Sequence, residues 1–371
     1  MRVCLISVEI FAWGKYGGFG RATRLIGAAL ARRGIDVTAV VPRRKGQKPV
    51  EDLDGMRVLS FRPYDLAEAS KLYRLADADV YHSEEPSLGT YLAMRAMPER
   101  KHVVTFRDTR LAQDWRTEFR LPSLNPAQVI ANWLYEDNWL VQRAVRKADA
   151  RFAAAQLLIP RARQKYSLPS DPAFLPTPVV VPDKLPKAAE PTACFVSRWD
   201  RRKRPEIFFE LAQAFPNVHF VAAGQSRDAE YDRYLREKYG KLPNLEMPGF
   251  IDQFRSDALT QLMGLSWILV NTAAREGLPN AFIEAAAHNC AILSAVDPDG
   301  FASRFGYCAN DDDFKRGLEV LLDGDRWREL AQRGYEYVRE VFSIDKAIDR
   351  HLAVYQELTG VSRPDLKGTG A

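Results

Sequence analysis

The sequence predicts an α/β protein made of two doubly wound parallel-sheet domains in tandem. Short apolar segments rich in β-branched residues alternate with amphipathic helical segments along most of the chain, which is typical of parallel sheets covered by helices. A proline-rich stretch interrupts this alternation near the middle, and the alternation then begins again. The length of 371 residues exceeds one ordinary core and suffices for two.

The first domain is expected to span residues 1–175. It opens with a buried strand, a glycine-rich stretch, a helix and a second strand, at residues 3–8, 14–20, 21–33 and 36–41. These segments form a strand–helix–strand unit whose strands are parallel. Further strands are expected at 56–61, 80–82, 103–106 and 151–154, and further helices at 88–97 and 128–147.

A linker is predicted at residues 176–192, because the seven prolines between 169 and 191 exclude a helix and disfavour a central strand. The second domain is expected at 193–343, followed by a helix at 344–360 and a disordered tail at 361–371. Its strands are expected at 193–197, 218–222, 245–247, 267–271 and 291–294, and its helices at 205–215, 231–239, 259–263, 280–288, 314–322 and 327–341.

Composition excludes several classes of protein. Charged residues make up 27% of the chain, as in folded soluble proteins. The net charge of +5 is too small and too dispersed to indicate nucleic-acid binding, but it suits an anionic ligand or an acidic membrane surface. The four cysteines show no metal-ligand spacing and lie in apolar settings, and no apolar run reaches about 18 residues. We therefore expect a cytoplasmic protein.

The helical segment at 128–147 permits two interpretations. Trp133, Tyr135 and Trp139, together with Arg143 and Arg146, suit a patch that faces an anionic membrane. The same helical spacing suits packing in the core, and we favour core packing. Peripheral contact with the inner membrane face remains the alternative.

Ligands of open parallel sheets bind outside the carboxyl ends of the strands. One such end carries RWDRRKRPE, where Arg198 closes the strand and Lys203 precedes the helix. A guanidinium fork and an ammonium match a diphosphate, whereas a solvated basic turn accounts for Arg201, Arg202 and Arg204.

A second such end carries REGLPNAFIEAAAHN, residues 275–289. A helix is expected to start at Pro279, which leaves backbone N–H donors near Gly277 and Leu278 for an anion. Glu284, about one turn into the helix, can accept hydrogen bonds from ribose hydroxyls. Glu276 lies nearer the phosphates, where a hexose would bind.

Together these two motifs resemble the retaining nucleotide-sugar glycosyltransferases of the GT-B fold, family four. Glu276 and Glu284 match the E-x7-E signature of that family. The segments VAAG, which ends at Gly224, and MPGFID, which contains Phe250, agree with it as well. The resemblance extends over nearly the whole chain and is densest at residues 193–345.

The resemblance implies two Rossmann-like domains that face each other across a cleft, with the helix at 344–360 packed back on the first domain. It implies that Arg198 and Lys203 hold the diphosphate, that Glu284 holds the ribose and that Glu276 contacts the transferred sugar. Arg198, Lys203 and Glu276 are thus the expected catalytic residues. Donor contacts are also expected from Gly224, Phe250, Gly277, Leu278 and Pro279.

In the first domain the resemblance implies that Gly17 and Gly18 let a loop approach phosphate or acceptor closely. The family often has a histidine after a T-x pair near the fourth strand, but here Arg107 follows Thr105-Phe106. Asp108 keeps the next position. His82, Arg107 and Asp108 are therefore retained only as residues expected to line the cleft.

The expected activity is transfer of a hexosyl or N-acetylhexosaminyl group from a UDP- or GDP-linked sugar, with retention of configuration. The acceptor is not identified by the sequence, and a glycolipid or a polysaccharide precursor is a candidate. No metal and no cofactor are expected, because turn formation accounts for DPD at 297–299 and helix capping accounts for DDD at 311–313.

Two other functions fit some of these residues. A glycoside hydrolase would use Glu276 and Glu284 as acid and nucleophile, but eight residues of helix span about 12 Å, more than the roughly 5–9.5 Å between such carboxyl groups. Flexible side chains close part of that gap, so the neighbouring cations are the better argument for a transferase. A nucleotide-sugar-binding protein without catalysis is the third interpretation.

Overall fold

The computed structural model describes residues 1–14, 16–120 and 126–360, and the chain divides into two compact units. Unit 1 comprises Met1–Thr109, Ile130–Pro178 and the segment from Ile344 onward, whereas unit 2 comprises Arg110–Val129 and Val179–Ser343. Each unit is a parallel sheet covered by helices, which confirms the predicted fold class. Residues 110–129, expected within a continuous first domain at 1–175, group with unit 2. The tail expected at 361–371 lies outside the described residues.

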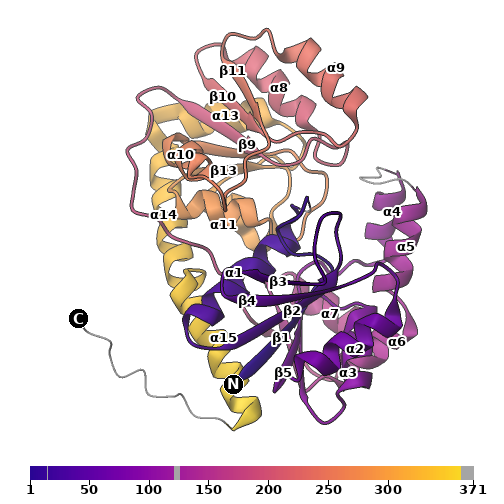
Figure 1. Cartoon of the computed structure of the whole chain (residues 1–371). Helices are drawn as coiled ribbons and strands as arrows, with labels where there is room; N and C mark the ends of the chain where they lie inside the picture. The colour runs from indigo at the N-terminus through magenta and orange to yellow at the C-terminus, as the bar shows by residue number, and fades with distance from the viewer. Residues whose placement is uncertain (15, 121–125, 361–371) are drawn as a thin grey trace. The chain divides into compact units, whose positions relative to one another are not determined.

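The sheet of unit 1 has eight strands in the order β3-β4-β2-β1-β5-β6-β7-β8 (Figure 1). Neighbouring strands are parallel except β3, which runs antiparallel to β4 at one edge. The strands are β1 Arg2–Ile6, β2 Asp36–Pro42, β3 Val50–Leu53, β4 Met56–Phe61, β5 Val80–Ser83, β6 Lys101–Phe106, β7 Ala150–Ala153 and β8 Ala173–Phe174.

Alternate residues of β1 face opposite layers of helices, because side chains alternate across a strand. Val3 and Leu5 pack in one cluster with α1 (Gly18–Arg32) and α15 (Ile344–Thr359). Cys4 and Ile6 pack in another with α2 (Leu66–Ala76) and α3 (Leu88–Ala96). Both faces of the sheet are thus covered, which explains why β1 reads as a continuous apolar run.

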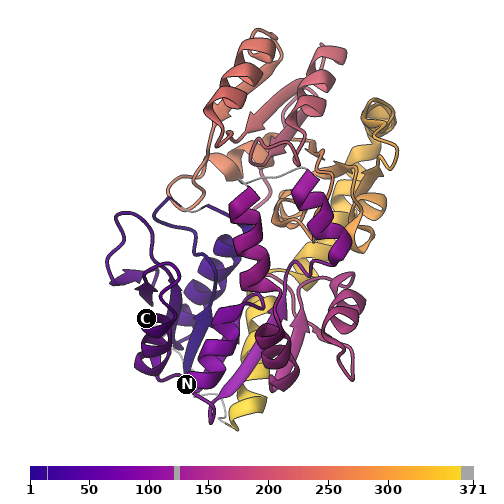
Figure 2. The same cartoon turned by 90° about the vertical axis from the view of Figure 1, so that its right-hand side faces the viewer.

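Helix α15 belongs to the core of unit 1 although it lies at the far end of the sequence. Its residues Ile348, Leu352 and Tyr355 share a buried cluster with β1, β2 and α1. Figure 1 and Figure 2 show α15, in yellow, beside the strands of this sheet. The core of unit 1 therefore needs residues from both ends of the chain.

The sheet of unit 2 has six strands, all parallel, in the order β11-β10-β9-β12-β13-β14. They are β9 Thr192–Val196, β10 His219–Ala223, β11 Leu245–Gly249, β12 Ile268–Asn271, β13 Ala291–Ser294 and β14 Gly306–Cys308. The helices around them are α8 Pro205–Ala214, α9 Ala229–Tyr239, α10 Ala258–Leu265, α11 Asn280–Ala287, α12 Phe301–Phe305, α13 Phe314–Leu322 and α14 Arg326–Val341, with short 3₁₀ turns at Pro298–Gly300 and Asp323–Asp325.

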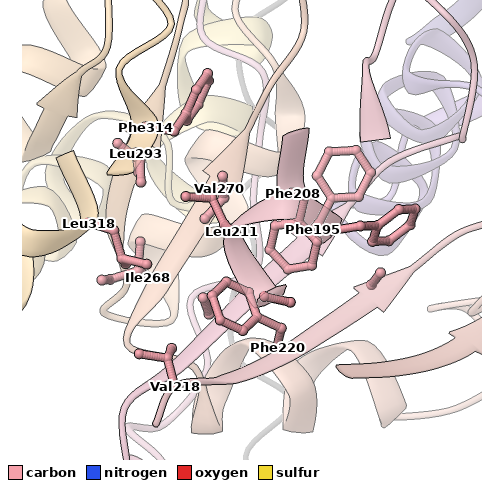
Figure 3. Close-up of a cluster of buried hydrophobic side chains, with 14 of the residues drawn as sticks. Phe195, Phe208, Leu211, Val218, Phe220, Ile268, Val270, Leu293, Phe314 and Leu318 are labelled. Carbon is pink, nitrogen blue, oxygen red and sulfur yellow. The ribbon is translucent and has the colours of Figure 1, made fainter. Parts of the chain in front are cut away.

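The core of unit 2 combines aromatic and aliphatic side chains (Figure 3). The ring centroid of Phe208 on α8 lies 5.4 Å from that of Phe195 on β9 and 5.3 Å from that of Phe220 on β10. All three side chains are buried. Such ring pairs add to the free energy gained by burying their area, so they fix α8 against the strands that lead into the candidate site.

The single helix expected at 128–147 is two helices, α5 (Pro126–Glu136) and α6 (Trp139–Lys147). Asn138 causes the break. Its side-chain oxygen accepts from the N–H groups of Leu140 and Val141 at 2.9 and 3.1 Å, and its amide donates to the carbonyl of Leu134 at 2.8 Å. Asparagine at an N-cap competes with continuation of the helix.

Core packing, the interpretation favoured for this segment, is wrong for its two tryptophans. Trp133 is 41% exposed and Trp139 is 67% exposed. Tyr135, by contrast, is largely buried, and burial raises the pKa of its hydroxyl to about 12. Periodicity shows that a helix has an apolar stripe, but not whether another element covers that stripe.

Several short elements were not expected from the sequence. Helices α2, α4 (Ala112–Arg120), α7 (Leu158–Tyr166) and α12, and strands β3, β8 and β14, are among them. Most are too short for a periodic pattern to be distinctive. Among the described residues, no helix combines the length and the apolar character needed to cross a membrane.

The role of α15 in the core of unit 1 leads to a prediction. Ile348→Ala should lower the free energy of unfolding by about 2–4 kcal/mol, because it leaves a cavity among buried side chains. Arg350→Ala, on the exposed side of the same helix, should change it by less than about 0.5 kcal/mol. Urea unfolding followed by circular dichroism measures both, and equal midpoints would contradict the packing of α15.

Candidate functional site

The candidate site begins where two neighbouring strands of unit 2 end. Strand β12 pairs with β9, with Ile268 opposite Ala193, so the segments that follow the two strands leave the same edge of the sheet. We call residues 197–204 the β9 loop and residues 272–279 the β12 loop. The sequence predicts donor-binding residues in both loops, and the structure brings several of them together.

The ammonium of Lys203 in the β9 loop forms an ion pair with the carboxylate of Glu276 in the β12 loop. The two side chains are 14% and 15% exposed. The hydroxyl of Thr272 also donates to the carbonyls of Lys203 and Arg204, at 2.6 and 2.9 Å. These contacts join two residues that lie far apart in the sequence and hold the loops against each other.

Arg198 is the more accessible cation of the β9 loop. Its side chain is 36% exposed, and its guanidinium lies 3.5 Å from the carboxylate of Asp200. The Asp200 side chain also accepts from the backbone N–H of Lys203 at 3.0 Å. Asp200 thus connects Arg198 to the turn that presents Lys203.

Helix α11 starts directly after the β12 loop. Pro279 is its N-cap residue, and a proline side chain carries no acceptor for the N–H groups of the first turn. Gly277 and Leu278 precede it, and Glu284 lies buried on the helix itself. The positive end of the helix dipole therefore lies next to the loop that carries Glu276.

Two further residues expected at the donor site directly follow β10 and β11. Gly224 follows β10 with φ of +146°, and a Cβ placed there would lie 1.9 Å from the carbonyl oxygen of Ser197. Its N–H donates to the carbonyl of Gly249 at 2.8 Å. Phe250 comes next after β11 and is exposed. Only glycine fits at position 224, because the β9 loop lies directly against it.

Arg201 is exposed, as expected of a solvated basic turn, but that interpretation is corrected for Arg202 and Arg204. Arg202 forms a buried ion pair with Glu118 of α4. Arg204 donates to the carbonyl of Thr272 at 2.6 Å and forms an ion pair with Asp312 at the same distance. Carboxylates distant in sequence pair with both arginines. The basic segment alone therefore does not reveal these partners.

The β12 loop is held in a similar way. Arg275, immediately before Glu276, forms an ion pair with Asp114 of α4 at 2.7 Å. Asp114 and Glu118 belong to no motif that the sequence alone reveals. The spacing of the two acids is the one sequence feature that indicates their shared role, since residues four apart on a helix share a face.

The acidic triplets have structural roles. Asp297 accepts from the N–H groups of Ala302 and Ser303 at the start of α12, at 2.8 and 3.1 Å. Asp313 caps α13 by accepting from the N–H of Arg316 at 3.0 Å. These contacts use the carboxylates for helix capping.

In unit 1, Gly17 and Gly18 begin α1, but a carboxylate already lies at this helix end. The side chain of Glu9 is buried and accepts from the N–H of Gly20 at 3.1 Å. A Cβ at Gly17 would lie 1.9 Å from the same carboxylate oxygen. The close approach expected of Gly17 is thus made by Glu9, and an incoming phosphate at this helix end would meet a like charge.

His82, expected to line a cleft, is fully buried in unit 1. Its Nδ1 lies 2.6 Å from the hydroxyl of Tyr355 on α15, and its Nε2 lies 2.7 Å from the hydroxyl of Thr105. Burial lowers the pKa of His82 to about 3, so the ring is neutral near pH 7. Both ring nitrogens are used within unit 1, which corrects the expectation for this residue.

Arg107 is buried as well and is held by Glu84. Its Nε donates to the Glu84 carboxylate at 2.9 Å, and its Nη1 donates to the hydroxyl of Thr177 at 2.6 Å. Burial alone would raise the pKa of Glu84, but the guanidinium of Arg107 keeps it below its usual value. Arg107 therefore connects the end of β6 to the segment after β8 instead of facing solvent.

Glu85 lies beside this pair. Its carboxyl group accepts from the N–H groups of Arg107 and Asp108, at 2.5 and 3.0 Å. The pKa of Glu85 is raised to about 8, chiefly by burial and also by the charge of Asp108, and the N–H group of Arg107 offsets part of this rise. Asp108, the third residue expected at a cleft, is half-buried.

Comparisons with known proteins agree with this architecture. The glycosyl transferase 4-like domain matches residues 17–176, and the glycosyl transferases group 1 family matches residues 181–339. No curated protein matches the chain.

Three similar solved structures cover nearly the whole chain. Sucrose-phosphate synthase from Thermosynechococcus elongatus has a TM-score of 0.76 at 17% identity, over 97% of this chain and 100% of that one. HepE of Anabaena, in complex with UDP-glucose, has 0.71 at 12% identity, over 96% and 100%. WaaG, a glycosyltransferase involved in lipopolysaccharide biosynthesis, has 0.68 at 16% identity, over 97% and 100%. The predicted GT-B fold is confirmed.

Glu85 gives the stability a distinct pH dependence. Its pKa is about 8 in the folded chain and near 4.3 when unfolded, so between these values only the folded state keeps the proton. The free energy of unfolding must therefore fall as pH rises from about 5 to 8. Glu85→Gln, which keeps an acceptor for the two N–H groups, should remove this contribution.

The measurement is urea unfolding of both proteins at pH 5, 6, 7 and 8. The stability of wild type relative to Glu85→Gln should decline steadily across the series. Parallel curves would show that Glu85 ionises in the folded chain as it does in water.

Proposed function

We propose that this chain, a GT-B glycosyltransferase built from a glycosyl transferase 4-like domain and a glycosyl transferases group 1 domain, uses a nucleotide diphosphate sugar as donor. Transfer proceeds with retention of configuration. The observation that carries the proposal is the meeting of Lys203 and Glu276 beside the first turn of α11. UDP- and GDP-linked hexoses or N-acetylhexosamines are the donor class.

The diphosphate is assigned to Arg198, Lys203 and the start of α11. Arg198 is accessible, and the backbone at Gly277 and Leu278 leads into a helix whose N-cap has no acceptor. An incoming diphosphate competes with Glu276 for the ammonium of Lys203 and frees the Glu276 carboxylate for the sugar hydroxyls. Cations and a helix start together stabilise the charge that develops on the leaving diphosphate.

The remaining donor contacts follow from where the side chains lie. The Glu284 carboxylate on α11 is assigned to the ribose hydroxyls, and Pro279 shapes the wall beside it. Gly224 lets the β9 loop pack against the end of β10 beside the assigned donor position, and the exposed ring of Phe250 offers a stacking surface. The complex of HepE with UDP-glucose supports a nucleotide sugar as donor for this fold.

In the reaction, the bond between the anomeric carbon and the phosphate oxygen breaks, and a bond to the acceptor hydroxyl oxygen forms on the same face of the sugar. The hydroxyl proton passes to the leaving phosphate oxygen, which becomes the terminal oxygen of the nucleoside diphosphate. Glu276 orients the sugar, and Arg198 and Lys203 take up the charge. The proposal assigns no role to a metal or a cofactor.

The first test is donor binding, which needs no acceptor. Lys203→Ala and Glu284→Gln should each weaken binding of the cognate nucleotide sugar by about 10–100-fold, because each removes charge-assisted hydrogen bonds. A thermal-shift panel of UDP, GDP and their sugars identifies the ligand, since saturation at a hundred times Kd adds about 2.7 kcal/mol. Titration calorimetry then measures each variant.

Lys315→Ala and Glu319→Gln, both exposed on α13 of the same unit, are the matched controls and should bind donor as wild type does. Unchanged affinity in both site variants would refute the donor site. Release of sugar from simple glycosides without nucleotide would favour the hydrolase, and nucleotide binding without transfer to any acceptor would favour the non-catalytic protein.

The exposed surface of α5 and α6 supports a membrane-associated acceptor. Trp133, Leu134 and Trp139 are exposed there. Arg143, one turn after Trp139, and Lys147 are exposed on α6 as well. Aromatic side chains beside cations suit an anionic bilayer surface. We assign the protein to the cytoplasmic face of a membrane, with a glycolipid or a polysaccharide precursor as acceptor.

Vesicle sedimentation tests this assignment. The protein should bind vesicles that contain 30% phosphatidylglycerol and not pure phosphatidylcholine, with an affinity that falls as salt rises. A double variant, Trp139→Ala/Arg143→Ala, should bind about 30-fold more weakly, since each residue contributes on the order of 1 kcal/mol. Tyr64→Ala, a control of similar exposure, should bind like wild type, and equal binding by all three proteins would contradict the assignment.

A further inference from the structure

Two proposed donor residues, Lys203 in the β9 loop and Glu276 in the β12 loop, each directly follow an arginine that pairs with α4. Arg202 precedes Lys203, and its guanidinium pairs with Glu118. Arg275 precedes Glu276, and its guanidinium pairs with Asp114 at 2.7 Å. Helix α4 therefore forms an ion pair with each loop, in both cases at the residue next to the Lys203–Glu276 pair.

The geometry of α4 allows it to form both ion pairs at once. Asp114 and Glu118 are four residues apart, so both carboxylates leave the same face of the helix. Each of these side chains is 7% exposed, and the arginines opposite them are 10% and 11% exposed. Asp114 also accepts from the N–H of Leu111 at 2.8 Å, which fixes the start of the helix.

Because these side chains are buried, each charge needs its partner in order to be stable. A charge removed from water is stabilised only if its partner stays in place. Of the nine residues of α4, only Trp115 is a buried apolar side chain. The two pairs, together with Trp115, therefore hold α4 on unit 2, and the same pairs connect Arg202 and Arg275 to α4.

The contacts form a closed ring through both loops. Starting from α4, the ring runs through the pairs Glu118–Arg202, Lys203–Glu276 and Arg275–Asp114, with neighbouring residues joined by the backbone. Within the ring, the N–H of Ala274 donates to the carbonyl of Arg202 at 2.9 Å. If either α4 carboxylate is removed, the ring loses the ion pair of the arginine next to Lys203 or Glu276.

We infer that Asp114 and Glu118 are positioning residues of the donor site. By holding Arg275 and Arg202, they fix the β12 loop and the β9 loop so that Glu276 and Lys203 meet. The effect on donor binding rests on the function proposed above, whereas the effect on the loops does not. Neither acid needs to touch the donor.

The test uses the full chain and a variant designed to fold. Glu118→Gln leaves the guanidinium of Arg202 buried without its charge partner, and misfolding is a risk. The double variant Glu118→Leu/Arg202→Met replaces the pair by apolar side chains of similar size, a change that commonly preserves stability. Asp171→Asn, which breaks an exposed pair with Arg163 in unit 1, is the control.

Hydrogen exchange of the loops is the first readout, because it does not require the reaction. In the double variant, the amides of residues 198–204 and 272–279 should exchange roughly tenfold faster than in wild type, while the strands of unit 2 keep their protection. The control should exchange as wild type does. Unchanged exchange in both loops of the folded double variant would overturn the inference.

Donor affinity is the second readout. The dissociation constant of the nucleotide sugar should rise roughly tenfold in the double variant, because a small displacement of Lys203 and Glu276 is costly. Tighter binding would overturn the inference, since it would show that α4 competes with the donor for the arginines. The two proposals can fail separately. Faster loop exchange in the double variant would uphold the positioning of the loops, and full donor binding by Lys203→Ala would at the same time refute the proposed donor site.

Discussion

The interaction on which the candidate site depends is the ion pair of Lys203 with Glu276. Two parallel strands deliver one cation and one anion to the same sheet edge, and both side chains are mostly removed from water. Neither charge is tolerable there alone. The pair therefore holds the β9 loop and the β12 loop against each other.

The two units use the carboxyl ends of their strands differently. In unit 1, His82 is bonded to Thr105 and Tyr355, and Arg107 is paired with Glu84. Glu9 lies at the start of α1. These polar groups stabilise one another inside the unit. In unit 2, Arg198 is accessible and α11 begins with a proline. Strand ends of parallel sheets thus carry polar groups with partners inside unit 1 and groups suited to an anion in unit 2.

The sequence predicted the sheets well and the side-chain partners poorly, for a physical reason. Buried parallel strands are apolar on both faces, so β1, β9 and β12 stand out as local patterns. Whether a charged residue is solvated depends on elements far along the chain. Arg202 was assigned to a solvated turn, yet its partner Glu118 lies 84 positions away. Gly17 was assigned to a ligand loop, yet Glu9 fills the space where a side chain would be.

The same dependence on distant residues applies to the assembly of unit 1. Its first strand is made from residues 2–6, but the hydroxyl that meets Nδ1 of His82 comes from Tyr355, 273 residues later. Ile348 and Leu352 close the apolar cluster around Val3 and Leu5. Until α15 exists, that face of the sheet exposes apolar surface and the buried imidazole lacks a partner. Unit 1 therefore reaches its final stability only after unit 2 has been synthesised, and long-range closure of this kind slows folding. The helix that ends the described chain is thus as much a part of the first sheet as the strand that begins it.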